Sequence, residues 1–211
     1  MFIHYRTEGI FLKKIDWGEA DQLLIEYTKN FGKLEILAKS VRKISSKLRS
    51  GADIFCLSEI EFVQGKTQKT LTDAILIEKF GNLKNDLAKI KVAYKIAETA
   101  DDLIKAPEPD NKIWRLLNEV FQKLNKYTIN PFRCTLIYYY FFWNLVSLLG
   151  YQPKIKDCTV QGKKFNCDTV KIIKLILKKE WEILLRLKIK PPHLKSLQEA
   201  AQWYKVKLHE L

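Results

Sequence analysis

Five segments of β-strand character lie within the first 77 residues, and they constrain the fold more than any other feature of the sequence. β-branched, aromatic and aliphatic side chains recur in these segments at roughly alternate positions. Tight turns, such as those at residues 30–32 and 65–66, separate most of them. Short strands joined by tight turns predict a small antiparallel barrel, for which the five-stranded OB-fold is the natural candidate. The segments are residues 6–14, 23–28, 32–39, 54–63 and 70–77.

The pattern changes near Phe80, where apolar residues begin to recur at steps of three and four. This spacing predicts a long helix over residues 83–104, which Pro107 ends together with the proline two residues later. We therefore expect an α+β chain. Its N-terminal part, residues 1–79, is predicted to be a five-stranded OB-fold β-barrel, and residues 80–211 an α-helical domain.

One predicted helix, from Cys134 to Leu149, is apolar almost all round. A membrane span needs about 20 such residues, and polar residues such as Asn144 interrupt this run. We therefore expect this helix to be buried in the middle of a bundle rather than to cross a membrane. Capping residues mark the other helices: Asp110 begins one through residue 124, Asn130 with Pro131 begins the apolar one, Asp168 begins one through about residue 179, and the pair Pro191-Pro192 precedes the last.

A polar loop follows the third strand segment and carries five cations with no acid between them. Such a loop repels itself unless an anion lies on it. Taken alone, it is most simply a solvated surface loop, but beside a barrel with a groove for single strands it becomes a candidate phosphate-binding surface. The formal net charge of +13 also indicates a polyanionic partner, either nucleic acid or a membrane surface. The candidate nucleic-acid-binding residues are Lys39, Arg42, Lys43, Lys47 and Arg49 in the loop, with Lys13, Lys14 and Lys33 extending the surface.

Other aromatic and sulfur-containing residues allow narrower expectations. Trp17, in the first hairpin turn, is either a partly buried turn aromatic or a ring exposed for stacking on a base. Cys56 and Cys134 lie in apolar segments and are expected in the core. Cys158 and Cys167 are expected to be free thiols in a loop, because a structural zinc site needs four ligands and no histidine lies beside them. We therefore predict no stoichiometric zinc, which elemental analysis of the purified protein would check.

The sequence holds no recognised catalytic motif, with no P-loop, G-x-S-x-G, H-E-x-x-H or GxGxxG pattern. The histidines lie near the two ends, and paired acids such as Asp101-Asp102 are typical of a solvated helix face. We therefore expect a protein that is not an enzyme and needs no cofactor. A nuclease is disfavoured because no set of carboxylates is clustered in the sequence. The first residues show no signal-peptide pattern, so a cytoplasmic location is expected.

Several short motifs lie along the chain: Tyr5–Lys14 with Gly18–Leu24, Gly32–Leu34 with Ala38–Lys43 and Ser46–Arg49, and Leu148–Pro153 with Cys158. In their order and spacing they resemble those of the RecO family of bacterial recombination mediators and DNA repair proteins. The resemblance spans most of the chain. One departure concerns zinc, because Gln161 stands where the family's second zinc-module cysteine is expected and no closing pair follows Cys167. Residues 151–167 therefore form a degenerate, metal-free zinc-module loop in this interpretation.

The resemblance implies binding of single- and double-stranded DNA and annealing of complementary strands. It also implies help in loading the recombinase RecA onto single strands covered by single-strand-binding protein. The implied protein partners are RecR and the acidic C-terminal tail of single-strand-binding protein, for which Arg133 is a candidate contact. The alternative is a non-enzymatic RNA-binding or adaptor OB-fold protein, which a comparison of DNA and RNA of equal length would distinguish.

Overall fold

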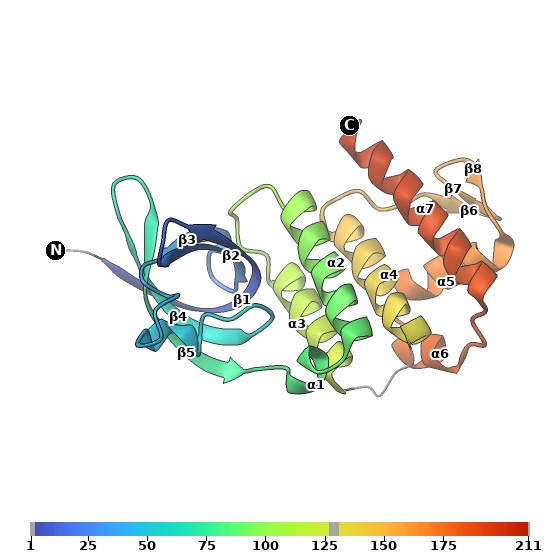
Figure 1. Cartoon of the computed structure of the whole chain (residues 1–211). Coiled ribbons are helices and arrows are strands. Elements are labelled where there is room, and N and C mark those ends of the chain that lie inside the picture. Colours follow the sequence, from blue (N-terminus) through green and yellow to red (C-terminus); the bar gives the residue numbers. More distant parts are fainter. Residues whose placement is uncertain (1–2, 127–130, 211) are drawn as a thin grey trace. The chain divides into compact units, whose positions relative to one another are not determined.

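The computed structural model describes residues 3–126 and 131–210, and Figure 1 shows the order of the elements. Contacts divide the chain into two compact units, Met1–Asn125 and Lys126–Leu211. The expected domain boundary at residue 79 marks the change from strand to helix. The first unit, however, also takes in the first three helices that follow the barrel. Its elements are β1 (His4–Trp17), β2 (Asp21–Thr28), β3 (Gly32–Ala38), a short 3₁₀ helix (Lys47–Arg49), β4 (Leu57–Gln64), β5 (Lys69–Glu78), α1 (Gly81–Lys84), α2 (Leu87–Leu103) and α3 (Asn111–Lys126).

The five strands close into a barrel in the order β1-β2-β3-β5-β4, which confirms the predicted OB-fold. The long strand β1 closes the barrel by pairing with β2 along one edge and with β4 along the other. The β3–β5 pair is the parallel one, with Ile36 opposite Lys69. The fourth strand was expected from residue 54 but begins at Leu57. Phe55 adopts a positive φ of 55° and donates its backbone N–H to the Phe11 carbonyl, so the chain turns there instead of extending.

Alternation along the strands fills the barrel interior with apolar side chains, and one carboxylate lies among them. Leu24 belongs to the core cluster, and Glu26 follows it on the same face of β2. Glu26 lies opposite Phe11 on β1 and Leu34 on β3, both members of that cluster. Its side chain is fully buried, and neither carboxylate oxygen has a hydrogen-bond partner among the described residues. Gly9 makes room for this group, since a Cβ there would lie 2.7 Å from Glu26 Oε2.

The helices of the first unit pack beside the barrel. The single helix expected from residue 83 is instead two, because the chain turns at Asn85 and Asp86 begins α2 by accepting from the backbone N–H of Ala88 and Lys89. The predicted cap at Asp110 is confirmed, since its carboxylate accepts from the first turn of α3. Phe55 joins the barrel to the helices by packing edge-on against Tyr94 of α2 and stacking on a ring of α3.

In its described residues, the second unit contains four helices and a small three-stranded sheet. The apolar helix α4 is buried as expected, and Asn144 within it donates to the carbonyls of Tyr140 and Ile176, which explains an amide in this position. Among the described residues no helix is both long enough and apolar enough to cross a bilayer. The expected cap at Asn130 lies outside the described residues. The elements are α4 (Pro131–Leu148), β6 (Ile155–Lys156), β7 (Thr159–Val160), β8 (Lys163–Lys164), α5 (Cys167–Leu177), α6 (Trp181–Arg186) and α7 (Pro191–His209).

Two expectations about the loop of residues 151–167 were wrong. Cys158 and Cys167 are not free thiols but form a disulfide, because the small sheet folds back and brings their Cα atoms to 4.5 Å. Asn166, not Asp168, caps α5 by accepting from a backbone N–H. Gln161 donates from its amide to the hydroxyl of Tyr204, 3.4 Å away, so this residue has a structural contact in the place of a thiolate. Cys56 and Cys134 are buried, as predicted, and neither takes part in a disulfide among the described residues.

Breaking the disulfide should destabilise the second unit. The bridge spans a sequence separation of 9, and a loop of about that length restricts the unfolded chain by roughly 2.5 kcal/mol. We expect Cys158→Ser with Cys167→Ser to lower the free energy of unfolding of this unit by about that amount, measured by urea denaturation. A thiol titration supplies the control, because the denatured wild type should expose two thiols without reductant and four with it. Four thiols in the absence of reductant would contradict the bridge.

Candidate nucleic-acid interface

The segment from Lys39 to Gly51, called the basic loop from here on, is held in a defined shape by its own backbone. Its first part lies on the β1–β2 turn, since Arg42 donates its N–H to the Ala20 carbonyl and Ser40 donates its N–H to the Asp21 carboxylate. Consecutive turns follow, with N–H groups donating to carbonyls three and four residues earlier. Val41 is buried within the barrel core cluster and anchors the loop. The cations are therefore presented from a preformed surface.

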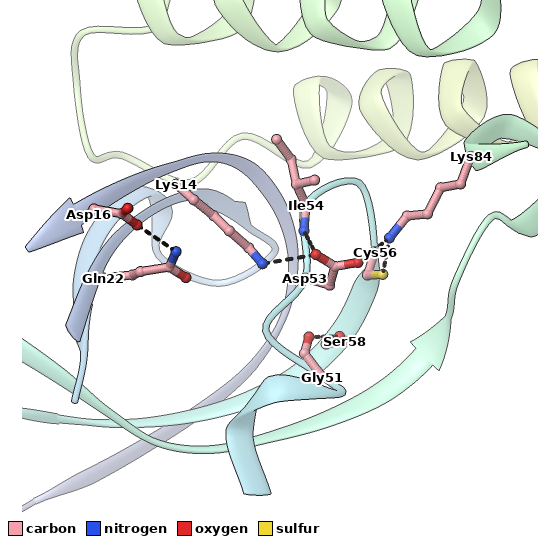
Figure 2. A network of polar contacts seen from close by, with 9 residues as sticks. All are labelled: Lys14, Asp16, Gln22, Gly51, Asp53, Ile54, Cys56, Ser58 and Lys84. Carbon is pink, nitrogen blue, oxygen red and sulfur yellow. Dashed lines mark hydrogen bonds and ion pairs between the residues drawn. The ribbon is translucent and has the colours of Figure 1, made fainter. Parts of the chain in front are cut away.

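The far end of the loop is fixed against the sheet. Gly51 comes so close to β5 that a Cβ would collide with the Ala74 carbonyl, which requires glycine. The Gly51 carbonyl also accepts from the Ser58 hydroxyl at 2.6 Å. Figure 2 shows this contact beside a second one, in which Asp53 lies between Lys14 of β1 and Lys84 of α1. The loop is thus clamped at both ends.

Asp53 remains negatively charged over a wide pH range. Burial alone would raise its pKa, but hydrogen bonds from Lys14 at 2.8 Å and Lys84 at 2.7 Å lower that pKa to about 2. The Lys84 ammonium also donates to the Cys56 thiol. Burial alone would lower the pKa of Lys84, but its bonds to Asp53 and Cys56 raise that pKa above its usual value. This network ties the loop, β1 and α1 together by charge.

The cations of the basic loop differ in what they contact. In the part of the chain that the structure describes, four of them are exposed and form no ion pair. Arg42 is the exception, because its guanidinium lies 3.5 Å from the Asp16 carboxylate, which also accepts from the Gln22 amide. Unpaired cations on a rigid, exposed loop are suited to phosphate oxygens. The four are Lys39, Lys43, Lys47 and Arg49.

The three lysines expected to extend this surface each lie beside a carboxylate group. Lys33 places its ammonium 2.6 Å from both the backbone carbonyl and the carboxylate of Asp101, so it caps the C-terminal end of α2. Lys13 lies 3.6 Å from the same carboxylate. Lys14 is bound to Asp53, as described above. Lys33 and Lys13 would have to leave Asp101 to reach a phosphate, whereas Lys14 faces the basic loop.

A pocket of about 470 Å³ lies where the basic loop meets β1 and β2. Lys14 comes from β1 and Gln22 from β2, while Arg42 and Arg49 come from the two arms of the loop. Asp53 lies at its edge. Positive charge therefore predominates in a concave site, where it acts more strongly on an anion than it would on an open surface.

Two large apolar side chains beside these cations are exposed to solvent. Trp17, the last residue of β1, is 56% exposed, so its ring is accessible for stacking although part of it is buried. Ile44 in the middle of the basic loop is 91% exposed. Sequence reasoning did not single out Gln22, Asp53 or Lys84. They join the site from three separate elements, and no local pattern marks them.

The comparisons with known proteins agree with this architecture. The family model described as "Recombination protein O N terminal" matches residues 1–80, and the one described as "Recombination protein O C terminal" matches residues 84–175. The chain belongs to the RecO family of DNA repair proteins. The basic loop lies wholly within the part that matches the N-terminal model of the RecO family.

Similar proteins named "DNA repair protein RecO" come from several bacteria. The one from Acetivibrio thermocellus is 30% identical over 75% of this chain and 62% of its own length. The one from Moorella thermoacetica is 34% identical over 74% of this chain and 57% of its own length. A third, from Dehalococcoides mccartyi, is 28% identical over 93% of this chain and 87% of its own length. The matched region thus covers less than two thirds of the first two relatives.

The zinc expectation stays a prediction for this member of the RecO family. The cysteines at 158 and 167 are joined to each other, so in this state their thiolates are not available as ligands. Within the described residues, no group of three or more histidine, cysteine, aspartate or glutamate side chains could hold a metal ion. Elemental analysis of the protein, purified without chelator or added metal, remains the test.

Proposed function

We propose that this chain binds single- and double-stranded DNA through the basic loop and anneals complementary strands during recombinational repair. The observation that carries the proposal is the preformed loop with four exposed cations that form no ion pair among the described residues. The family to which the chain belongs supports DNA as the polyanion. In this proposal the protein is a cytoplasmic DNA-binding protein that carries out no covalent chemistry.

Charge neutralisation is the physical basis of the proposed annealing. Two complementary strands repel each other through their phosphates, and cations that replace condensed counterions reduce that repulsion. Phosphate contacts carry no base information, so the bases of a bound strand remain able to select their complement. The exposed Trp17 ring could hold one base by stacking at the side of the loop. The chain would then promote pairing without preferring a sequence.

An annealing assay tests this function. Complementary oligonucleotides coated with single-strand-binding protein should pair faster when the full chain is present, and the acceleration should fall as salt rises because binding is electrostatic. Uncoated strands and an RNA pair of equal length serve as the comparisons. Equal or higher affinity for RNA would favour the alternative of an RNA-binding or adaptor protein. Failure to accelerate pairing at low salt would contradict the proposal.

The proposal includes a role in loading RecA, with RecR and the tail of single-strand-binding protein as partners. A groove of about 340 Å³ in the second unit supports the tail as a ligand. Leu136 and Leu184 are buried at its floor, and the guanidinium-bearing Arg133 and Arg186 are exposed at its rim. An acidic peptide with apolar side chains would match both parts of such a groove. The position of Arg133 at this groove supports its proposed contact with the tail.

We therefore predict that a labelled peptide with the acidic tail sequence binds the full chain, and that Arg186→Ala weakens this binding. The exposed rim cation should pair with a peptide carboxylate, and its loss should reduce affinity about fivefold. Fluorescence anisotropy at low salt is the measurement. Lys195→Ala, an exposed cation on α7 that does not line the groove, is the matched control. Equal losses in the two variants would show a non-specific effect of charge.

A further inference from the structure

The pocket beside the basic loop is larger than phosphate binding alone requires. Its volume of about 470 Å³ lies within the roughly 300–1,000 Å³ found for sites that enclose small organic ligands. A backbone phosphate needs only exposed cations on an open surface. The question is therefore which phosphate-bearing group would enter the pocket.

The arginines indicate where the phosphate would lie. Among the described residues Arg49 forms no ion pair, whereas Lys14 is bound to Asp53 and Arg42 lies 3.5 Å from Asp16. Arg49 is therefore the pocket cation whose charge is least compensated. Guanidinium groups hold phosphate oxygens through two parallel hydrogen bonds, and Arg42 lies on the opposite arm of the loop to assist.

The remaining walls suit a nucleoside. Val41 and Ala52 close the bottom of the pocket and are 3% and 0% exposed, so the accessible walls are the aliphatic stems and polar ends of the other side chains. Such stems, together with the flat guanidinium faces, can cover the face of a base. Gln22 adds an amide, held by its hydrogen bond to Asp16, that could meet the polar edge of the base.

We propose that this pocket takes one nucleotide of the bound strand, turned out of the base stack, with its phosphate on Arg49 and Arg42. The inference rests on the proposed DNA binding and adds a defined site to it. Asp53 keeps Lys14 in place at the pocket edge, so the walls are formed before the strand arrives. Taking a base out of the stack costs less free energy in a single strand than in a duplex, which favours unpaired DNA as the ligand.

A first test uses 2-aminopurine, whose emission rises when the base leaves the stack, placed among adenines in a single-stranded oligonucleotide. Saturating this oligonucleotide with the full chain at low salt should raise the 2-aminopurine emission. Arg49→Lys keeps the charge and the salt dependence of binding but loses the paired hydrogen bonds, so the rise should disappear. Arg115→Lys, an exposed arginine on α3, is the matched control and should behave as wild type.

The outcomes separate the inference from the proposed function. Tight, salt-dependent binding with unchanged emission would leave DNA binding intact and overturn the pocket. A rise that persists in Arg49→Lys would place the unstacked base elsewhere and also overturn it. Absence of any DNA binding would remove both proposals together.

A second test uses mononucleotides and identifies the chemical class of the ligand. Deoxyadenosine monophosphate should displace the labelled oligonucleotide at lower concentration than inorganic phosphate or deoxyadenosine does, because only the nucleotide fills both parts of the pocket. Its affinity for Arg49→Lys should be about tenfold weaker. Equal displacement by inorganic phosphate and the nucleotide would show a simple anion site and overturn the inference.

Discussion

Replacing Arg42, Lys43, Lys47 and Arg49 together by alanine is expected to lower the slope of log affinity against log salt by up to roughly 3. Each phosphate neutralised on a single strand contributes about 0.7 to that slope. The loss of affinity should be similar for every DNA sequence, because phosphate contacts do not read bases. Annealing should fall with binding if charge neutralisation is the mechanism. The measurement is single-strand affinity at several salt concentrations for wild type and the fourfold variant.

A second fourfold variant controls for the loss of net charge. The control replaces four of the cations of the first unit that lie outside the basic loop, are exposed and form no ion pair among the described residues: Lys79, Lys91, Lys112 and Arg115. Replacing them by alanine removes the same formal charge but should leave the slope nearly unchanged. Circular dichroism should show both variants folded, since exposed substitutions usually change stability by less than about 0.5 kcal/mol each. An unchanged slope in the folded loop variant would make the loop a solvated surface and place the DNA elsewhere.

The second large effect is expected at Glu26, whose carboxyl group lies in the barrel interior and has no hydrogen-bond partner in the described part of the chain. Burial raises the pKa of Glu26 from 4.5 to about 8, because the charged form loses its solvation. The folded state therefore holds the proton more tightly than the unfolded state. The contribution of protonated Glu26 to the free energy of unfolding is fully present below pH 4.5. It is lost progressively as the pH rises through 8, and the loss amounts to roughly 4 kcal/mol at pH 8.

Glu26→Gln should remove this dependence. The amide does not titrate, so the stability of the variant relative to wild type should increase by about 3 kcal/mol between pH 5 and pH 8. Glu26→Met, which also removes the unpaired polar atoms, should be at least as stable as the glutamine variant at pH 8. Urea unfolding of the first unit at several pH values measures both. Parallel pH profiles for wild type and the glutamine variant would show that this carboxyl group is solvated or paired in solution.

The outline of the fold could be predicted from the sequence because it depends on local periodicity. Alternation with a period of two predicts strands, and steps of three and four predict helices, whatever the rest of the chain does. The apolar helix and the cap at Asp110 were predictable for the same reason. Alternation also places Glu26 on the same face as Leu24, so its burial could have been inferred from the strand pattern.

The candidate site could be predicted only in part. A run of cations without acids is visible in the sequence, and the structure shows all five exposed on one loop, four of them without an ion pair among the described residues. Residues distant in the sequence decide which of the cations at the site have a carboxylate neighbour. Asp16 reaches Arg42, and Asp53 holds Lys14, through pairings that the barrel creates.

The sequence by itself determined the barrel, the apolar helix and the position of the basic loop, since each depends on neighbours within a few residues. Only the tertiary structure decided that Lys33 caps the C-terminal end of α2, because the carbonyl to which its ammonium donates belongs to a residue 68 positions away. The same holds for the bridge between Cys158 and Cys167, which forms because a small sheet turns the chain back on itself. A charge or a thiol has the same local pattern whether it is free or bound, and its partner is known only when the chain is folded.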